Sequence, residues 1–370
     1  MLNFNKPCYI GKEETAIQEA IMNQTLAGNG PFGEKCVDWL ENYLDCERAI
    51  LTPSCTAALE MTALLIDTKP GDEIIMPSYT FVSTANAFAL RGASIQFVDV
   101  SPDTMNISPE AVEAAVTEKT KAIVVVHYAG ISCDMDAIMK IADKNSLWVI
   151  EDAAQALMST YNGKQVGTIG HFSTLSFHET KNITCGEGGA LIINHAASIE
   201  RAEILQEKGT NRQQFAKGMV DKYTWRDVGS SYLLNELSAA YLWIQLQHAE
   251  QITEDRLLTW HSYYEGLKHI GAISIPHIPA ECTHNAHMFF VKTDHRDALM
   301  KYLKSNGIMA VSHYVPLHSS YAGKKFGQFA GDDNYTTAES EKLVRLPLYY
   351  GMEEKDVTHV INHINDFFKT

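Results

Sequence analysis

The chain has 370 residues, a length that predicts two domains, one of them large. Apolar residues make up 45% of it and charged residues 20%, so the chain can pack an interior and its composition does not indicate disorder. The formal net charge of −15, together with the lack of a basic run, argues against a nucleic acid or an anionic membrane as a partner.

The cysteines and the N-terminus bear on the cellular compartment. The seven cysteines are scattered and form no C-x-x-C pair, which favours free thiols over a zinc site or a disulfide framework. The N-terminus has no basic segment followed by an apolar stretch, and no run approaches the roughly 18 apolar residues of a membrane span. We therefore expect a cytoplasmic protein.

The first motif in the chain is a G-x-G-x-x-G pattern from Gly28 to Gly33. A dinucleotide site needs a strand before this pattern and a helix that opens within it. Residues 14–23 have a helical pattern instead, and Pro31 lies inside the motif. The context therefore predicts a flexible loop rather than a dinucleotide site.

Small hydroxyl residues follow at 52–56 and run directly into a helix predicted over 57–65. Such a helix start offers backbone N–H groups and the positive end of the helix dipole to a phosphate. An ordinary helix cap has the same pattern, so this segment alone leaves both interpretations open.

Strand and helix patterns alternate between residues 50 and 193. Strands are predicted at 72–76, 94–100, 122–126 and 147–150, where near-continuous apolarity indicates burial on both faces. Helices are predicted after the Ser108-Pro109-Glu110 start signal and from Asp134 onward. This alternation is typical of a mostly parallel α/β sheet with helices on both faces, which binds ligands at the carboxyl ends of its strands.

Two charged residues follow predicted strands. Asp152 comes after the strand at 147–150, where a buried carboxylate needs a cation or a hydrogen-bond donor, unless it only caps a helix. Lys181 precedes the glycines of 186–189, which would let the backbone approach a flat group closely, although a solvated surface lysine is the ordinary alternative. Pyridoxal 5′-phosphate is held by a phosphate cradle, an aromatic residue, an aspartate and a lysine. This chain has candidates for all of these parts in this order, with Tyr79 and Phe81 as the aromatic residues.

The pattern changes after about residue 227. A long helix is predicted over 234–267, then a strand at 288–292 and a helix at 297–305. We therefore predict a large domain at 1–247 and a smaller C-terminal α+β domain at 248–370. His284 and His287 have no indicated third ligand, so no metal site is predicted.

Several of these segments together resemble the DegT/DnrJ/EryC1/StrS family of sugar aminotransferases, over residues 28–318. The resemblance is carried by the runs at 77–86 (PSYTFVSTAN), 126–130 (VHYAG), 151–155 (EDAAQ), 176–181 (SFHETK) and 186–189 (GEGG). It implies the fold of a fold-type I pyridoxal-phosphate-dependent transferase and a homodimer with shared active sites. It also implies pyridoxal 5′-phosphate as cofactor, with pyridoxamine 5′-phosphate formed during the reaction.

The resemblance also implies roles for individual residues. Lys181 would bind the cofactor covalently and move the proton, and Asp152 would face the pyridine nitrogen. Gln155 would contact the ring hydroxyl oxygen and Phe81 would stack on the ring. The phosphate would be held by Thr56, Ala57 and Ser176, with Ser231 reaching in from the partner subunit. Family members commonly have asparagine and arginine where this chain has Ser231 and Leu233, so Ser231 would supply a hydroxyl instead.

The segments 208–212 and 223–232 are similar to the branch of the family that makes dTDP-4-amino-4,6-dideoxygalactose. This likeness implies that L-glutamate donates its amino group to the C4 keto group of a dTDP-4-keto-6-deoxyhexose. His127, at a strand end, and His318, in a Pro-Leu-His turn, are candidates for the sugar pocket. Arg212 and Arg226 are candidates for the diphosphate, because a guanidinium matches phosphate oxygens; surface salt bridges are the alternative.

Three alternative functions differ in the residues that they need. An aminotransferase for 3-keto sugars would have nearly the same cofactor residues. A dehydratase of this fold has histidine in place of the lysine, whereas this chain keeps Lys181. A non-catalytic regulator would not need Lys181, Asp152 and an aromatic stack together.

Overall fold

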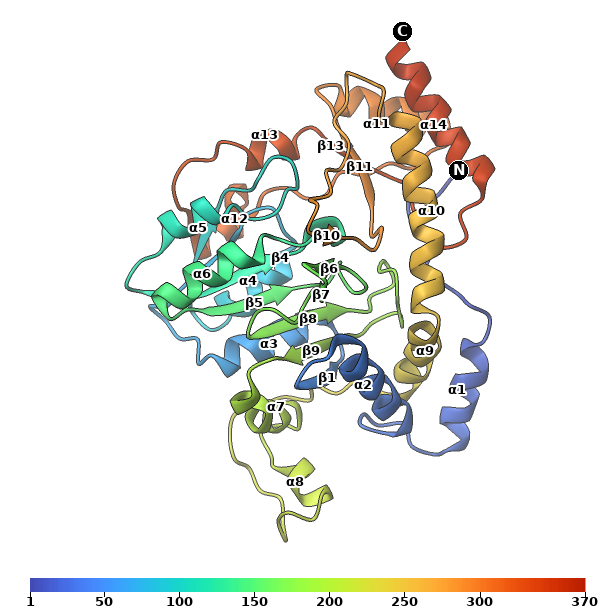
Figure 1. The fold of residues 1–370 in the computed structure, drawn as a ribbon. Helices are drawn as coiled ribbons and strands as arrows, with labels where there is room; N and C mark the ends of the chain where they lie inside the picture. The colour runs from blue at the N-terminus through green and yellow to red at the C-terminus, as the bar shows by residue number, and fades with distance from the viewer. Residues whose placement is uncertain (370) are drawn as a thin grey trace.

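The computed structural model describes residues 1–369 and is built on a sheet of eight strands with helices on both faces (Figure 1). The spatial order of the strands is β1 (Arg48–Thr52), β9 (Gly189–Ile193), β8 (Phe172–Ser176), β5 (Trp148–Asp152), β4 (Thr120–Val126), β2 (Glu73–Pro77), β3 (Ser94–Val98) and β12 (Gly327–Phe329). Strand β9 is antiparallel to both of its neighbours, and all other neighbouring pairs are parallel. The predicted mostly parallel α/β sheet is confirmed.

The four strands predicted between residues 72 and 150 lie side by side in this sheet as β5, β4, β2 and β3. Successive side chains of a strand point to opposite faces. In β4, Ala122 and Val124 accordingly pack into the apolar cluster on one face, and Ile123 and Val125 into the cluster on the other. Both faces are covered, which explains the near-continuous apolarity of the sequence.

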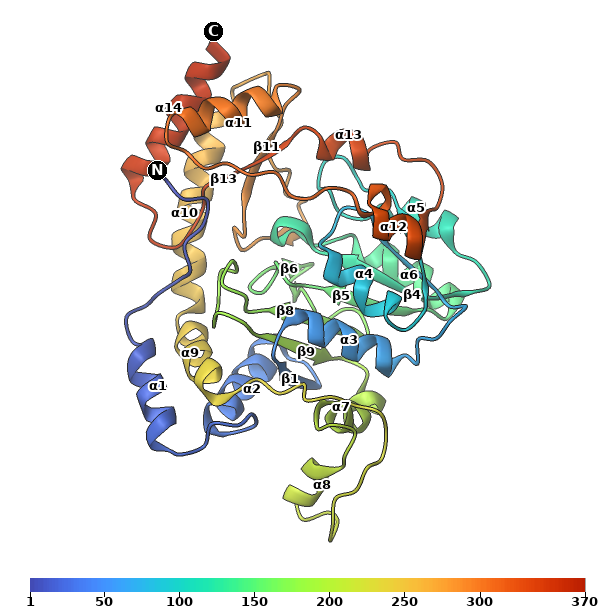
Figure 2. The same ribbon diagram turned by 180° about the vertical axis from the view of Figure 1, so that it is seen from behind.

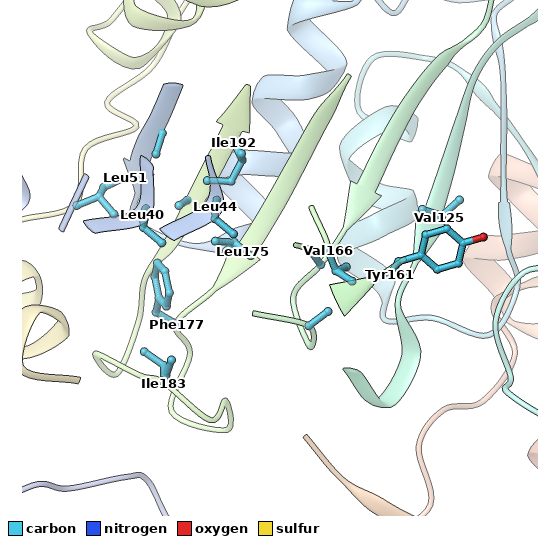
Figure 3. Packing of buried hydrophobic residues seen from close by; sticks show 14 of the residues in the cluster. Leu40, Leu44, Leu51, Val125, Tyr161, Val166, Leu175, Phe177, Ile183 and Ile192 are labelled. Atoms are coloured by element: carbon cyan, nitrogen blue, oxygen red, sulfur yellow. The ribbon is translucent and has the colours of Figure 1, made fainter. Parts of the chain in front are cut away.

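Helices divide between the two faces. The first face carries α2 (Pro31–Leu44), α5 (Pro109–Ala115), α6 (Met135–Asn145) and α9 (Glu236–Gln247), and the second carries α3 (Cys55–Leu65), α4 (Val82–Ala89) and α7 (Ile199–Gln206). Figure 3 shows the core of the first face, where Leu40 and Leu44 of α2 lie near Leu51, Leu175 and Ile192 of the sheet. Helices α3 and α4 lie in front in the view of Figure 2.

The structure corrects two sequence predictions. Residues 28–33 are not entirely a loop, because α2 begins at Pro31, whose fixed φ suits the first helical position. The carboxylate of Glu236 accepts hydrogen bonds from the backbone N–H groups of Phe32 and Gly33, both at 2.8 Å, and so stabilises this helix start. The long helix predicted over 234–267 is two helices, α9 and α10 (Ala249–Leu267), which break at His248 (φ −114°, ψ 17°).

The C-terminal residues form a second core. Helices α10, α11 (Arg296–Ser305) and α14 (Glu354–Lys369) enclose the antiparallel pair β11 (Phe289–Lys292) and β13 (Leu343–Leu346). Helix α10 runs along one side of the molecule, and the N-terminus lies near α14 (Figures 1 and 2). Two segments after residue 248 pair with earlier strands, β12 with β3 and β10 (Cys282–Thr283) with β6 (Thr160–Tyr161). The domain boundary at 247/248 stays a prediction.

The remaining elements are short. They are α1 (Glu13–Met22), α8 (Arg212–Ala216), α12 (Tyr321–Phe326), α13 (Thr336–Ser340), β7 (Lys164–Gln165) and the 3-10 turns Tyr128–Gly130, Ala196–Ser198 and Leu317–Ser319. Helix α8 and the loop after it extend away from the rest of the chain (Figure 1). Within residues 1–369, no helix combines the length and the apolarity that crossing a membrane requires.

Candidate active site

A cavity of about 370 Å³ lies at the carboxyl ends of the central strands. The last residues of β4, β5 and β8, which are Val126, Asp152 and Ser176, all line it. Parallel strands end at the same edge of a sheet, so the topology gathers these residues although they are far apart in sequence. Six of the residues predicted to hold the cofactor line this cavity: Thr56, Phe81, Asp152, Gln155, Ser176 and Lys181.

The start of α3 forms one wall of the cavity. Ser54 caps the helix, and its Oγ accepts the N–H of Ala57 at 3.1 Å. The first amides of a helix lack intrahelical acceptors, so Cys55 and Thr56, which line the cavity, bring the positive helix end to it. The predicted Ala57 amide is therefore used within the cap, and Ala57 does not line the cavity.

Hydroxyl groups and a glycine complete this wall. Thr56 Oγ1 donates to Ser83 Oγ at 2.8 Å, and Ser176 lies at the end of β8. A Cβ atom at Gly189 would overlap the backbone of Ser54 and Cys55. Only glycine at this position lets β9 approach the helix start so closely.

Asp152 is a buried carboxylate whose partners are all neutral. Its Oδ2 accepts from Thr84 Oγ1 at 2.7 Å, and its Oδ1 accepts from the Ala154 N–H at 3.2 Å. Within residues 1–369 it forms no ion pair. Burial raises the pKa of Asp152, because the charged form loses water. A cationic group that enters the cavity would therefore gain a strong partner in Asp152.

Lys181 follows β8 in a tight turn, where its backbone N–H donates to the His178 carbonyl at 2.9 Å. Burial of the side chain lowers the pKa of Lys181 from its ordinary 10.5, and the attraction of Asp152 offsets this only in part. The lysine is thus biased toward the neutral amine, which is the form that acts as a nucleophile or a base.

This shift predicts a pH-dependent stability difference in the cofactor-free protein. The unfolded chain holds the Lys181 proton up to about pH 10.5, whereas the folded protein loses it at a lower pH. The wild type therefore gains stability as the pH rises between these two values. We expect Lys181→Met to be more stable than the wild type at pH 7 and to lose that advantage toward pH 10.5. Urea unfolding across this range measures it; a difference independent of pH would contradict the prediction.

Gln155 and Phe81 both lie next to Tyr314. Gln155 Oε1 accepts from the Ala129 N–H at 2.8 Å, and its Nε2 donates to the Tyr314 hydroxyl at 3.2 Å. The Phe81 ring lies 6.1 Å from that of Tyr314, and Phe81 is 56% exposed. An apolar ring left open beside a cavity suits stacking against a planar ligand.

These features fit pyridoxal 5′-phosphate. The cavity combines a helix start and hydroxyls for a phosphate, a buried carboxylate without a cation, an open aromatic ring, and a lysine biased toward its neutral form. Among residues 1–369, no three histidine, cysteine or acidic side chains are grouped as a metal site would need.

Besides Ala57, five of the predicted residues lie outside this cavity. His127 is fully buried, with Nε2 3.0 Å from Glu151 Oε2, and so has no surface with which to touch a sugar. His318 bonds to Ser78 at 2.7 Å and lies 3.3 Å from Asp333. Arg212 lines a second cavity of about 500 Å³ beside α2 and β1, and Arg226 and Ser231 are exposed on the loop after α8.

The buried pair of His127 and Glu151 explains why His127 does not face the cavity, although it follows a central strand. Glu151 accepts hydrogen bonds from three backbone N–H groups, those of Gly167, Ile169 and Gly170, at 2.9, 2.8 and 2.6 Å. Although burial works against ionisation, His127 and these N–H groups lower the pKa of Glu151. His127 thus stabilises the buried carboxylate of Glu151 and does not face the cavity.

Thr84, Tyr314 and Arg345 are among the cavity residues that were not predicted from the sequence. Thr84 had a local signal, because it lies three positions after Phe81 at the start of a helix and so shares its side of α4. Tyr314 and Arg345 had none, since they lie far along the chain, Arg345 on β13, and meet the cavity only through the tertiary fold.

Comparison with known proteins decides the family. Residues 7–365 match the DegT/DnrJ/EryC1/StrS aminotransferase family. The chain belongs to this family. Members of the DegT/DnrJ/EryC1/StrS family are aminotransferases, and the fold and the predicted family resemblance are confirmed together.

Three relatives illustrate the likeness. An uncharacterized protein of Methanocaldococcus jannaschii is 35% identical over 97% of this chain and 95% of its own length. The solved aminotransferase TlmJ of Streptoalloteichus hindustanus is 29% identical, with a TM-score of 0.91 over 99% of this chain and 98% of its own. The Streptococcus pneumoniae protein Spr1654, solved in a PLP-form, shares 24% identity and the fold, with a TM-score of 0.91 over 100% of this chain and 98% of its own.

Proposed function

We propose that the protein transfers an amino group from L-glutamate to the C4 keto group of a dTDP-4-keto-6-deoxyhexose, giving dTDP-4-amino-4,6-dideoxygalactose and 2-oxoglutarate. The observation that carries the aminotransferase part is the meeting of Lys181 and Asp152 in one cavity beside the start of α3. The sugar part is supported by the family to which the chain belongs and by the likeness of residues 208–212 and 223–232 to one of its branches.

Several of the cavity residues would have a task in this reaction. Pyridoxal 5′-phosphate, when bound, supplies the group that accepts and returns the amino nitrogen and withdraws electrons from the reacting carbon. Asp152 would hold a proton on the pyridine nitrogen, with Thr84 fixing the carboxylate. The Lys181 amine, in its neutral form, would take the proton from the α-carbon of the donor and deliver it to the cofactor carbon on the other side of the amino nitrogen, and would run the same shift backwards on the sugar.

The other contacts would orient the ring. Phe81 would cover one ring face, and Gln155, held by Ala129 and Tyr314, would reach the ring oxygen. Thr56, Ser176 and the amides at the start of α3 would bind the phosphate. A net charge of −15 is compatible with this, because helix-end N–H groups and hydroxyls supply the attraction.

The homodimer with shared active sites is part of this proposal. Ser231 is exposed and does not line its own cavity, so it could reach phosphate only in another subunit. The segment that carries it is rich in exposed apolar side chains, namely Phe215, Met219, Tyr223, Trp225 and Val228. Arg212 and Arg226 lie on the same segment and stay candidates for the diphosphate of a partner-bound substrate. Sedimentation should give a particle of two chains.

One experiment tests the substrate. The protein is incubated with L-glutamate and a panel of dTDP-4-keto and dTDP-3-keto sugars, and the amino sugar is identified by NMR. We expect a 4-amino product with the galacto configuration. A 3-amino product would establish the regiochemical alternative, a deoxy sugar without nitrogen would indicate a dehydratase, and no reaction with any sugar would contradict the proposal.

A further inference from the structure

His287 is a buried histidine that shares two cavities with Lys181. It lies two residues before β11, is 6% exposed, and lines the main cavity. A second cavity of about 20 Å³, called the small cavity below, adjoins the first and shares with it Lys181, Gln155 and His287. Asn182 also lines the small cavity. A polar space of this size accommodates one water molecule.

Hydrogen bonds fix the tautomer of the His287 ring. Asn182 Nδ2 donates to the Asn285 carbonyl at 2.8 Å, so Asn182 Oδ1 is the atom that lies 3.0 Å from His287 Nδ1. An amide oxygen can only accept, and Nδ1 therefore carries the proton. Burial, together with the positive charge of Lys181, lowers the pKa of His287 well below its ordinary 6.5, so the ring is neutral at pH 7. Nε2 then offers a lone pair, and within residues 1–369 no protein group donates to it.

The backbone of His287 is also held in place. Its N–H donates to Asn285 Oδ1 at 3.0 Å, and its carbonyl accepts from Arg256 Nη2 at 2.8 Å. The side chain of Asn285 in turn donates to the carbonyls of Gln155 and Leu157, both at 2.8 Å. These bonds tie His287 to the segment that carries Gln155, so the ring has a fixed place beside the cavity.

The charges around Lys181 leave a task for a neutral acceptor. In the proposed reaction Lys181 becomes a buried cation whenever it holds the proton from the α-carbon. Arg345 on β13 repels this cation, and Asp152 on β5 attracts it. Asp152, however, is the carboxylate that would face the pyridine nitrogen. Cys55, at the start of α3, supplies no negative charge at pH 7, because burial raises the pKa of its thiol to about 12.

The other titratable side chains of the main cavity have partners elsewhere. Glu187 Oε1 lies 3.7 Å from His178 Nε2, and both side chains are exposed to solvent. His313 Nδ1 lies 2.9 Å from Arg345 Nη1, and the Tyr314 hydroxyl accepts from Gln155. Within residues 1–369 none of these four side chains bonds to Lys181. His287 is therefore the neutral acceptor that shares the small cavity with the lysine.

We propose that His287 positions the Lys181 amine through one water molecule bound in the small cavity. The water would accept a hydrogen bond from the protonated amine and donate one to His287 Nε2. A bridging water is nearly as favourable in enthalpy as a direct hydrogen bond, and a hydrogen bond to the charged form stabilises that form. The bridge would support the lysine while it carries the proton. The inference rests on the proposed aminotransferase function, because that reaction supplies the proton.

His284 shows what a purely structural histidine looks like in the same segment. Its Nδ1 accepts from the Ala286 N–H at 3.2 Å, and its ring lies 4.4 Å from that of Trp260. Burial lowers the pKa of His284 to about 4, so this ring is neutral as well. His284 lines neither cavity. It is therefore a matched control for His287.

The test measures the pKa of Lys181 in the cofactor-free protein. Acetic anhydride acetylates only the neutral amine, and mass spectrometry of the peptide that carries Lys181 gives the rate at each pH. His287→Asn keeps a donor for Asn182 but loses the acceptor at the Nε2 position, and His287→Gln does the reverse. We expect the pKa of Lys181 to fall by about one unit in His287→Asn and to stay near the wild-type value in His287→Gln.

Thermal stability separates this role from a structural one. The bond to Asn182 should make His287→Asn the more stable of the two variants, although it is the one that shifts the pKa. His284→Asn should leave the pKa of Lys181 unchanged. The proposal is overturned if the pKa in His287→Asn stays the same or rises, or if His284→Asn lowers it equally. This decision stands even if His287→Gln does not fold.

The outcome is independent of the substrate. Labelling needs neither cofactor nor donor nor sugar, so a failure of the sugar panel leaves this test intact. An unchanged pKa in His287→Asn would remove the role of His287 and leave the aminotransferase function standing.

Discussion

Lys181→Ala should abolish turnover, with a loss of at least ~10⁴-fold in kcat. Alanine can neither bind the cofactor covalently nor carry the proton between the α-carbon and the cofactor. Both half-reactions should fail, because the same amine serves each of them. Single-turnover measurements with L-glutamate, and separately with the keto sugar and pyridoxamine-loaded protein, check this, as does the loss of the absorbance of lysine-bound pyridoxal.

Added small amines provide a sharper readout for the same variant. If Lys181 acts as the base, methylamine should restore part of the rate, since it can occupy the space left by the side chain. Lys164→Ala, at an exposed lysine on β7, should behave as the wild type. Unimpaired turnover in Lys181→Ala would rule out the assigned role.

The second large effect is expected at Asp152. Asp152→Asn keeps the shape of the side chain but removes the charge that would hold a proton on the pyridine nitrogen. We expect kcat to fall by ~10²- to 10³-fold in both half-reactions, because the electron withdrawal from the reacting carbon depends on that proton. Stopped-flow measurement of each half-reaction gives the values.

Thr84→Val is the matched control for this charge. It removes the 2.7 Å hydrogen bond to Oδ2 but leaves the carboxylate in place. We expect a loss of the order of 10-fold, in line with a single hydrogen bond to a charged group. Equal losses in the two variants would show that the orientation of Asp152, and not its charge, is what matters.

The sequence predicted the parts of the site that carry local signals. Ser54 to Thr56 stand before a helical pattern, Asp152 follows a continuous apolar strand, and Lys181 precedes a glycine-rich turn. Each signal lies within a few residues of the side chain it marks, and the alternating strands and helices place these segments at one edge of a sheet. The central strands and six of the cavity residues could therefore be predicted.

The residues that could not be predicted depend on packing between distant segments. His127 and Asp152 both stand at the end of an apolar strand, so their local patterns are the same. The His127 side chain nevertheless bonds to the buried Glu151, whereas Asp152 lines the cavity. Hydropathy alone does not distinguish these two directions. The break at His248 was missed for a related reason, because apolar and helix-forming residues continue on both sides of it.

The sequence by itself determined the α/β class, the family, and the order of a helix start, an aspartate and a lysine. Only the tertiary structure decided which side chains share a cavity. The reason is that residues 313–314 and Arg345 of β13, which are distant in sequence, line the cavity together with the residues at the strand ends. Arg345 is the clearest case. In the sequence it is one arginine in an apolar strand, and in the fold it is a buried cation beside Lys181 with donors left free.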